Sequence, residues 1–120
     1  MKSSEPMTFK RSERVADRIR EEAADILQNR VSDPGIGFVT VVSVHVSNDL
    51  KHARIHIGVM QGDEDETLKG LNRAKSFIRR ELAHRLKLRY APEISLHIDH
   101  SAEEAERVIR LIDEVNKEGS

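Results

Sequence analysis

The feature that most constrains the fold is a set of three short segments in which apolar and polar residues alternate. Residues 38–46 are rich in β-branched side chains and alternate in their second half, and residues 53–59 and 94–98 alternate throughout. Such alternation is typical of strands with one covered face and one polar face. Asn48-Asp49 supplies turn-forming residues between the first two segments. We therefore expect an antiparallel hairpin, with residues 94–98 as a third strand.

Segments in which apolar residues recur at helical spacing lie between and around these strands. The first is expected over residues 11–30 and stops before Asp33-Pro34-Gly35. A second begins after the acidic run 63–66, and a third begins with the capping-box pattern Ser101-x-x-Glu104. Helices on one face of a three-stranded sheet make an α+β, two-layer domain.

The second helical segment is interrupted near its middle. Ala74, Lys75 and Ser76 break the apolar stripe, and Ser76 is a residue type that caps helices. We therefore expect a bent pair of helices, the second starting at Phe77, rather than one straight rod. The predicted order is helix, strand, strand, helix, bend, helix, strand, helix.

Length and composition favour one small intracellular domain. The 120 residues suit a single core, and we expect residues 1–8 to be a flexible leader, 9–117 the domain and 118–120 a tail. The chain has no cysteine, which removes disulfides and thiolate chemistry. The N-terminal residues lack an apolar signal core, and no apolar run approaches the roughly 20 residues that span a bilayer. These features predict a cytoplasmic protein with no membrane association.

The net charge of −1 hides a strong polarisation along the chain. Between Lys69 and Arg89 eight basic residues face a single acidic one, Glu81. Local charge sets the potential that a polyanion meets, so this segment is the predicted RNA-binding site. Its candidate residues are Lys69, Arg73, Lys75, Ser76, Arg79, Arg80, Arg85, Lys87 and Arg89, and Arg11, Arg14 and Arg18 on the first helix are candidates to extend it. The alternative is a solvated charged helix with no partner.

Four short motifs occur in order along the chain. They are Arg14-Val15 before an isoleucine-rich helix, Asp33-Pro34-x-x-Gly37 leading into Thr40-Val41, Val46-Ser47-x-Asp49-Leu50-x-x-Ala53, and Leu86-x-Leu88-Arg89-x-x-Pro92-Glu93-Ile94. Together they resemble the ribosome-binding factor A family over residues 9–113. The resemblance implies a type II K-homology (KH)-like domain in which a short Ala-x-Gly interruption replaces the usual glycine loop. Here Ala74, Lys75 and Ser76 occupy that interruption, so the family's glycine is absent.

The resemblance also implies a function. Family members would bind the free or immature small (30S) ribosomal subunit and promote late maturation of the 5′ region of 16S rRNA, with most effect in the cold. We accordingly expect a monomer whose partners are 16S rRNA and the small subunit, acting by binding, without enzymatic activity, a cofactor or a metal. The alternative, also without catalysis, is a generic module that binds RNA or another protein.

Two patterns allow a different reading. His45, His56 and His97 fall on the predicted polar face of the sheet, one per strand, and three imidazoles can bind zinc in an enzyme. Ordinary solvent-facing strand residues are the simpler explanation. Asp99-His100-Ser101 contains the residue types of a hydrolase triad, but consecutive residues do not easily converge, so we expect Ser101 to cap a helix instead.

Overall fold

The computed structural model describes residues 7–118, with side chains from residue 11 onward. Its elements are α1 (Met7–Asn29), β1 (Phe38–Val46), β2 (His52–Gln61), α2 (Glu64–Leu86), β3 (Glu93–Ile98) and α3 (Ser101–Glu118). The predicted α+β, two-layer, type II KH-like arrangement with a three-stranded sheet is confirmed. α1 begins at Met7, four residues before the expected start, so it includes the last two residues of the expected leader 1–8. Residues 1–6 of that leader and residues 119–120 of the expected tail lie outside the described part.

The sheet has the order β1-β2-β3 and is mixed. β1 and β2 pair antiparallel as the predicted hairpin, with Val44 opposite Ile55. β3 pairs parallel with β2, with Leu96 opposite Ile55. A parallel neighbour requires a crossover connection, and α2 provides it. The chain therefore returns to the starting end of β2 before β3 begins.

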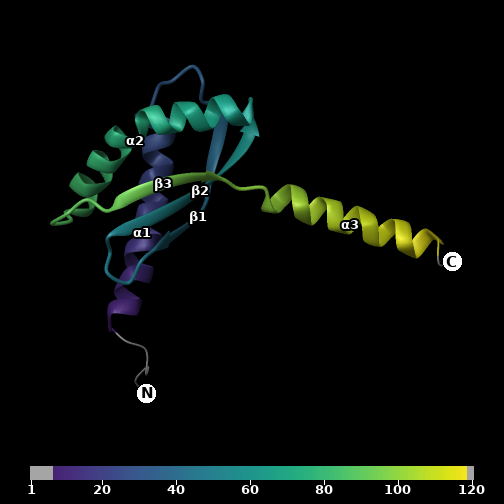
Figure 1. Cartoon of the computed structure of the whole chain (residues 1–120), viewed down its shortest axis with the longest axis horizontal. Helices are drawn as coiled ribbons and strands as arrows, with labels where there is room; N and C mark the ends of the chain where they lie inside the picture. The colour runs from purple at the N-terminus through teal and green to yellow at the C-terminus, as the bar shows by residue number, and fades with distance from the viewer. Residues whose placement is uncertain (1–6, 119–120) are drawn as a thin grey trace.

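The core lies between one face of this sheet and the helices α1 and α2 (Figure 1). Its fully buried centre includes Ile19 and Ile26 of α1, Ile55 and Ile57 of β2, and Leu71, Ile78 and Leu82 of α2. The helical residues recur at intervals of three, four or seven, so each helix presents one apolar stripe to the sheet. The remaining faces of both helices are left for solvent or partners.

The expected division of the second helical segment into two helices is wrong, whereas the expected bend is present (Figure 1). α2 is one hydrogen-bonded helix from Glu64 to Leu86, so Ser76 lies inside it and opens no new N-terminus with free N–H groups. Figure 1 shows that the axis of α2 nevertheless changes direction along its length. Asp63 caps the helix by accepting a 2.9 Å hydrogen bond from the backbone N–H of Glu66. Lys87 ends it in the left-handed conformation with φ of 53°.

α3 projects away from the sheet (Figure 1), and every described residue in it is exposed. Its start also differs from the expected capping box. The carboxylate of Asp99 accepts hydrogen bonds from both the backbone N–H and the hydroxyl of Ser101, so Asp99 supplies the cap and Ser101 is the first helical residue. Within the described residues no helix is long and apolar enough to cross a membrane.

Candidate nucleic-acid interface

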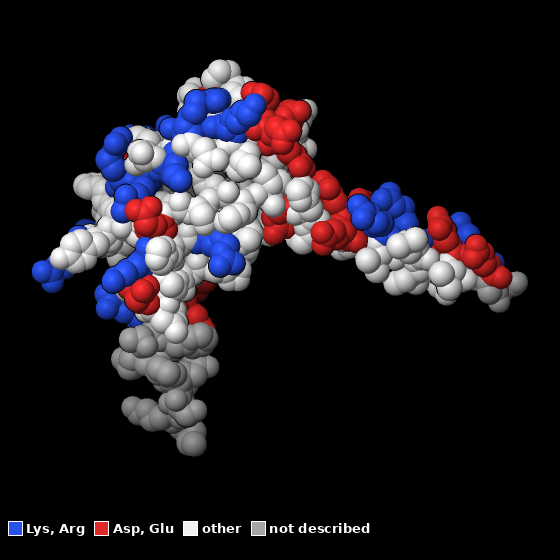
Figure 2. All heavy atoms as spheres, viewed as in Figure 1, with Lys and Arg blue, Asp and Glu red and all other residues white. Residues whose placement is uncertain are grey.

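The outer face of α2 carries one stripe of exposed residues. They are at positions 65, 66, 69, 72, 73, 76, 80, 84 and 87, and apart from the adjacent pairs 65/66 and 72/73 they follow one another at three or four residues, as on one helical face. Figure 2 shows Lys and Arg gathering over α2, whereas Asp and Glu gather where α2 begins and along part of α3. The acidic run thus stays at the N-terminus of α2, where it complements the helix dipole. The remaining length of the stripe is basic or neutral.

Arg73 lies on this stripe but is held by the loop that follows α1. Its guanidinium donates two hydrogen bonds to the carboxylate of Asp33, at 3.0 Å and 2.8 Å. The bidentate pair lowers the pKa of Asp33 to about 2, with a further contribution from the backbone N–H of Gly35. Asp33 is therefore ionised at neutral pH and neutralises Arg73. The Asp33-Pro34 turn is fastened to α2 through this pair.

Arg79 and Arg85 also have intramolecular partners. Arg79 donates to the backbone carbonyls of Ala91 and Pro92, each at 3.0 Å, and so anchors the α2–β3 connection. Arg85 donates to Glu22 at 3.0 Å and to Asp25 at 2.6 Å, and thus joins α2 to α1. Hydrogen bonding from Arg85 lowers the pKa of Asp25, which keeps that partner charged. Arg79 and Arg85 therefore stabilise the fold, whereas the charge pattern alone had made both of them candidates for RNA binding.

The other predicted residues of α2 are available to a partner. Ser76, Arg80 and Lys87 are exposed, and neither Arg80 nor Lys87 forms an ion pair with any residue in the described part of the chain. Lys69 has only a long, exposed contact of 3.7 Å with Glu66, which contributes little. Lys75 is half-buried at the margin of the stripe. We call Lys69, Lys75, Arg80 and Lys87 the basic face of α2.

The candidates outside α2 fall into two groups. Arg14 and Arg18 are exposed on α1 near the acidic residues Glu13 and Asp17. Arg11 instead lines a hollow of about 440 Å³ together with Arg89, Lys51 and Tyr90. Lys51 and Tyr90 were not identified from the sequence, because each lies in a connection between elements where no periodic pattern marks a shared surface.

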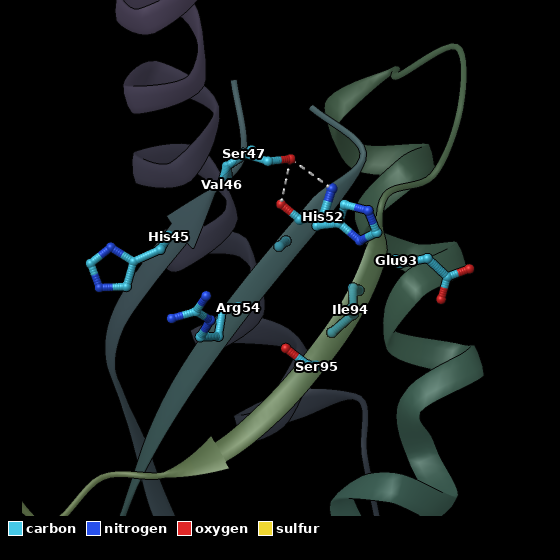
Figure 3. Close-up of a pocket in the computed structure, with 9 residues that line it drawn as sticks. His45, Val46, Ser47, His52, Arg54, Glu93, Ile94 and Ser95 are labelled. Carbon is cyan, nitrogen blue, oxygen red and sulfur yellow. Dashed lines mark hydrogen bonds between the residues drawn. The ribbon is translucent and has the colours of Figure 1, made fainter. Parts of the chain in front are cut away.

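The open face of the sheet carries the predicted histidine row, and Figure 3 shows its first member, His45, with Arg54 and Ser95 on the neighbouring strands. The ring centroids of His45 and His56 are 5.5 Å apart, and those of His56 and His97 are 5.4 Å apart. Burial, followed by the nearby His97 and His45, lowers the pKa of His56, so its neutral form is favoured. A hollow of about 580 Å³ beside this row is lined by Arg54 and Ser95 among others. The histidines are thus neighbours across the three strands, a lateral register that the sequence alone did not determine.

The described residues contain one group whose ligand atoms converge within 4.8 Å, and it is not this row. It consists of Glu64, His100 and Glu103. His100 and Glu64 already form a 2.7 Å ion pair, and hydrogen bonding to Glu64 raises the pKa of His100. The pair satisfies both side chains without an ion, and it connects the start of α2 to the start of α3.

A two-layer α+β domain with this strand order and one open sheet face defines the class as KH-like. The family model for ribosome-binding factor A matches residues 11–112. The chain belongs to the ribosome-binding factor A family. A ribosome-binding factor A from Azoarcus sp. (strain BH72) is 42% identical over 115 residues, covering 94% of this chain and 91% of that protein.

Solved structures agree on the fold. The crystal structure of ribosome-binding factor A from Thermus thermophilus superimposes with a TM-score of 0.64 at 22% identity, covering 71% of this chain and 92% of that one. A Thermus thermophilus homology model of the same factor, fitted into a cryo-electron microscopy map of its complex with the 30S subunit, gives a TM-score of 0.62 at 22% identity, covering 71% and 91%.

Proposed function

We propose that the protein is a ribosome assembly factor that binds the free or immature small ribosomal subunit through its 16S rRNA. Residues 9–117 act as the single RNA-binding domain, as a monomer in the bacterial cytoplasm. Binding promotes late maturation of the 5′ region of 16S rRNA, and it matters most in the cold, where RNA rearranges slowly. The mechanism is a shift in population: contacts made to one RNA arrangement favour it by their difference in affinity between arrangements. No covalent step is required.

The observation that carries this proposal is the basic face of α2. Lys69, Arg80 and Lys87 project from the side of α2 opposite the core, with Lys75 at its margin. The nearby acidic residue Glu81 contacts Arg30 and Arg85 instead of these cations. Cations left without intramolecular partners are the groups that displace counterions from a phosphate backbone. The family membership supports the choice of RNA, since the 30S complex is named for a relative.

Co-sedimentation with purified small subunits at low and moderate salt tests the proposal. The comparison is between the wild type and Arg80→Glu/Lys87→Glu, which reverses two charges of the basic face. Both residues are exposed and unpaired within the described chain, so the variant should remain folded by circular dichroism and lose binding. Arg20→Glu/Arg54→Glu is the matched control, because it makes the same charge change on exposed residues of α1 and the open sheet face.

The wild type should bind, and its affinity should fall with salt by about 0.7–0.9 units of log–log slope per phosphate contact. Absence of wild-type binding to both mature and immature subunits would remove the ribosomal proposal. Equal loss in the test and control variants would show that net charge, rather than the basic face, drives binding.

A further inference from the structure

One helix and two connections of the fold meet at the hollow of about 440 Å³ that Arg11 lines. Arg11 comes from α1, Leu50 and Lys51 from the β1–β2 turn, and Arg89 and Tyr90 from the α2–β3 connection. These segments are far apart in sequence, so only the fold brings them together. The volume is within the range of sites that take a small ligand or one unit of a polymer, about 300–1,000 Å³.

Tyr90 gives the hollow an aromatic surface. Its side chain is 76% exposed, more than any other large hydrophobic residue in the described part of the chain. The guanidinium of Arg89 lies 5.5 Å from the centre of the ring, a cation–π arrangement that orients both groups. The ring of a tyrosine is usually largely buried in the fold, so a ring as exposed as that of Tyr90 is available to stack on a planar partner.

The charges around the hollow favour an anion. Arg11, Lys51 and Arg89 form no ion pair with described residues. The two acidic residues of the lining are already engaged. Asp49 accepts hydrogen bonds from the hydroxyl of Ser47 at 2.6 Å and from the backbone N–H of Lys51 at 3.0 Å. Glu93 lies 3.3 Å from the guanidinium of Arg79. Arg79 offsets the charge of Glu93, and Asp49 stays ionised, so the three cations of the lining outweigh the one carboxylate that has no cationic partner.

Backbone strain is concentrated at the same place. Within the described residues, Leu50 and Lys87 are the non-glycine residues with positive φ, at 62° and 53°. Leu50 lines the hollow, and Lys87 immediately precedes Leu88, which also lines it. The conformation of Lys87 belongs to the cap that ends α2 and that of Leu50 to the β1–β2 turn, so both fix the backbone around the hollow.

We infer that this hollow binds one unpaired nucleotide of RNA, with the base stacked on Tyr90 and the flanking phosphates paired with Arg11, Lys51 and Arg89. The inference rests on the proposed function, because it extends the contact made by the basic face of α2. Aromatic stacking accepts any base, and arginine matches phosphate with two parallel hydrogen bonds. A single-stranded or flipped-out nucleotide has both groups accessible, whereas a base inside a duplex does not.

Salt-dependent binding of the full chain to purified small subunits tests the inference with three variants. Tyr90→Leu removes stacking and keeps an apolar side chain, whereas Tyr90→Phe keeps stacking. Tyr90→Leu should weaken binding about 5- to 100-fold at every salt concentration with an unchanged log–log slope, and Tyr90→Phe should bind within about twofold of the wild type. Lys51→Ala should lower the slope by about 0.7, and the control Arg20→Ala, on exposed α1 surface away from the hollow, should leave it unchanged.

Ultraviolet cross-linking followed by mass spectrometry identifies what touches Tyr90. A nucleotide adduct on Tyr90 supports the inference, and an adduct with a ribosomal protein overturns it. Wild-type affinity for Tyr90→Leu, while Arg80→Glu/Lys87→Glu loses binding, also overturns it and leaves the proposed function standing. Equal losses in Tyr90→Leu and Tyr90→Phe would exclude stacking. Thermal unfolding of each variant verifies the fold, which the exposure of Tyr90 should leave intact.

Discussion

Arg79 and Arg80 are neighbours in sequence with opposite structural roles, and this contrast gives a quantitative prediction. Arg79 donates to the carbonyls of Ala91 and Pro92, whereas Arg80 is exposed and has no ion pair with described residues. Charge pattern alone treats the two residues as equivalent. Substituting each in turn with glutamine removes one positive charge and leaves a polar side chain of moderate length, so the two variants are matched.

The expected cost of Arg79→Gln follows from the two hydrogen bonds that it loses. A hydrogen bond to a charged group contributes about 1.5–3 kcal/mol, and the 40% exposure of the Arg79 side chain reduces that value through solvent screening. We expect the free energy of unfolding to fall by about 1–2 kcal/mol, which corresponds to about 3–12 °C in melting temperature for a domain of this size. Arg80→Gln should leave the melting temperature within about 1 °C.

In binding to small subunits, Arg80→Gln should have the larger effect and Arg79→Gln the smaller one, the reverse of their effects on melting temperature. Arg80→Gln should reduce the slope of log affinity against log salt by about 0.7–0.9, because one phosphate contact is lost. Arg79→Gln should keep the wild-type slope at a temperature where it is folded. Differential scanning calorimetry and salt titration measure the two quantities independently. Equal changes in slope for both variants, or an equal loss of melting temperature, would refute the division of the basic run into structural and binding residues.

Three further predictions concern stability. Gly37→Ala should be destabilising by about 1–3 kcal/mol in urea unfolding, because an added Cβ would lie 1.9 Å from the carbonyl oxygen of Gln61; an unchanged midpoint would mean that this backbone contact is absent. His56 has a lowered folded-state pKa, so the unfolded chain takes up a proton first and stability should fall as pH drops below about 6.5; His56→Gln should flatten that part of the profile, and an unaltered slope would contradict it. Asp33 has a folded pKa of about 2 against an ordinary 3.8, so its pair with Arg73 should stabilise fully above pH 3.8 and lose this effect as pH falls toward 2; Asp33→Asn should reduce the acid dependence in thermal melts at different pH and leave the part due to carboxylates such as Asp25, and a profile as steep as that of the wild type would contradict it.

Most of the fold could be predicted because it follows from local periodicity. The strands 38–46 and 94–98 were located to within one residue, and alternation correctly predicted a sheet with one covered face. The helix break at 74–76 was wrong because Ser76 is tolerated on the exposed side of a helix whose opposite side is held by Leu71 and Ile78. Tertiary burial of that stripe outweighs the local capping preference of serine.

The candidate site was harder to predict because its chemistry depends on partners distant in sequence. Arg85 meets Glu22 across 63 residues, and Arg73 meets Asp33 across 40. No spacing rule indicates such pairs, since the rules for helices concern neighbours three or four positions apart. The sequence did not predict that Lys51 and Tyr90 share a surface, because they too are distant in sequence. Residue type and local charge predicted α2 as the RNA-binding helix, whereas only the fold separates the cations that hold this helix in place from the cations that face outward.

That separation has a consequence for how strongly the protein can bind. The four cations of the basic face and the three of the hollow give seven phosphate contacts, fewer than the eleven basic candidates that the sequence offers, eight in the charge run and three on α1. Six or seven contacts imply a fall in affinity of about three orders of magnitude between about 50 and about 200 mM salt. Under the proposed function, such a limit allows the protein to leave the subunit, because the loss of a few contacts as the RNA rearranges is enough to release it. The arginines that pair with Glu22, Asp25, Asp33 and the α2–β3 connection stabilise the domain, and under the same proposal they also keep the number of phosphate contacts small.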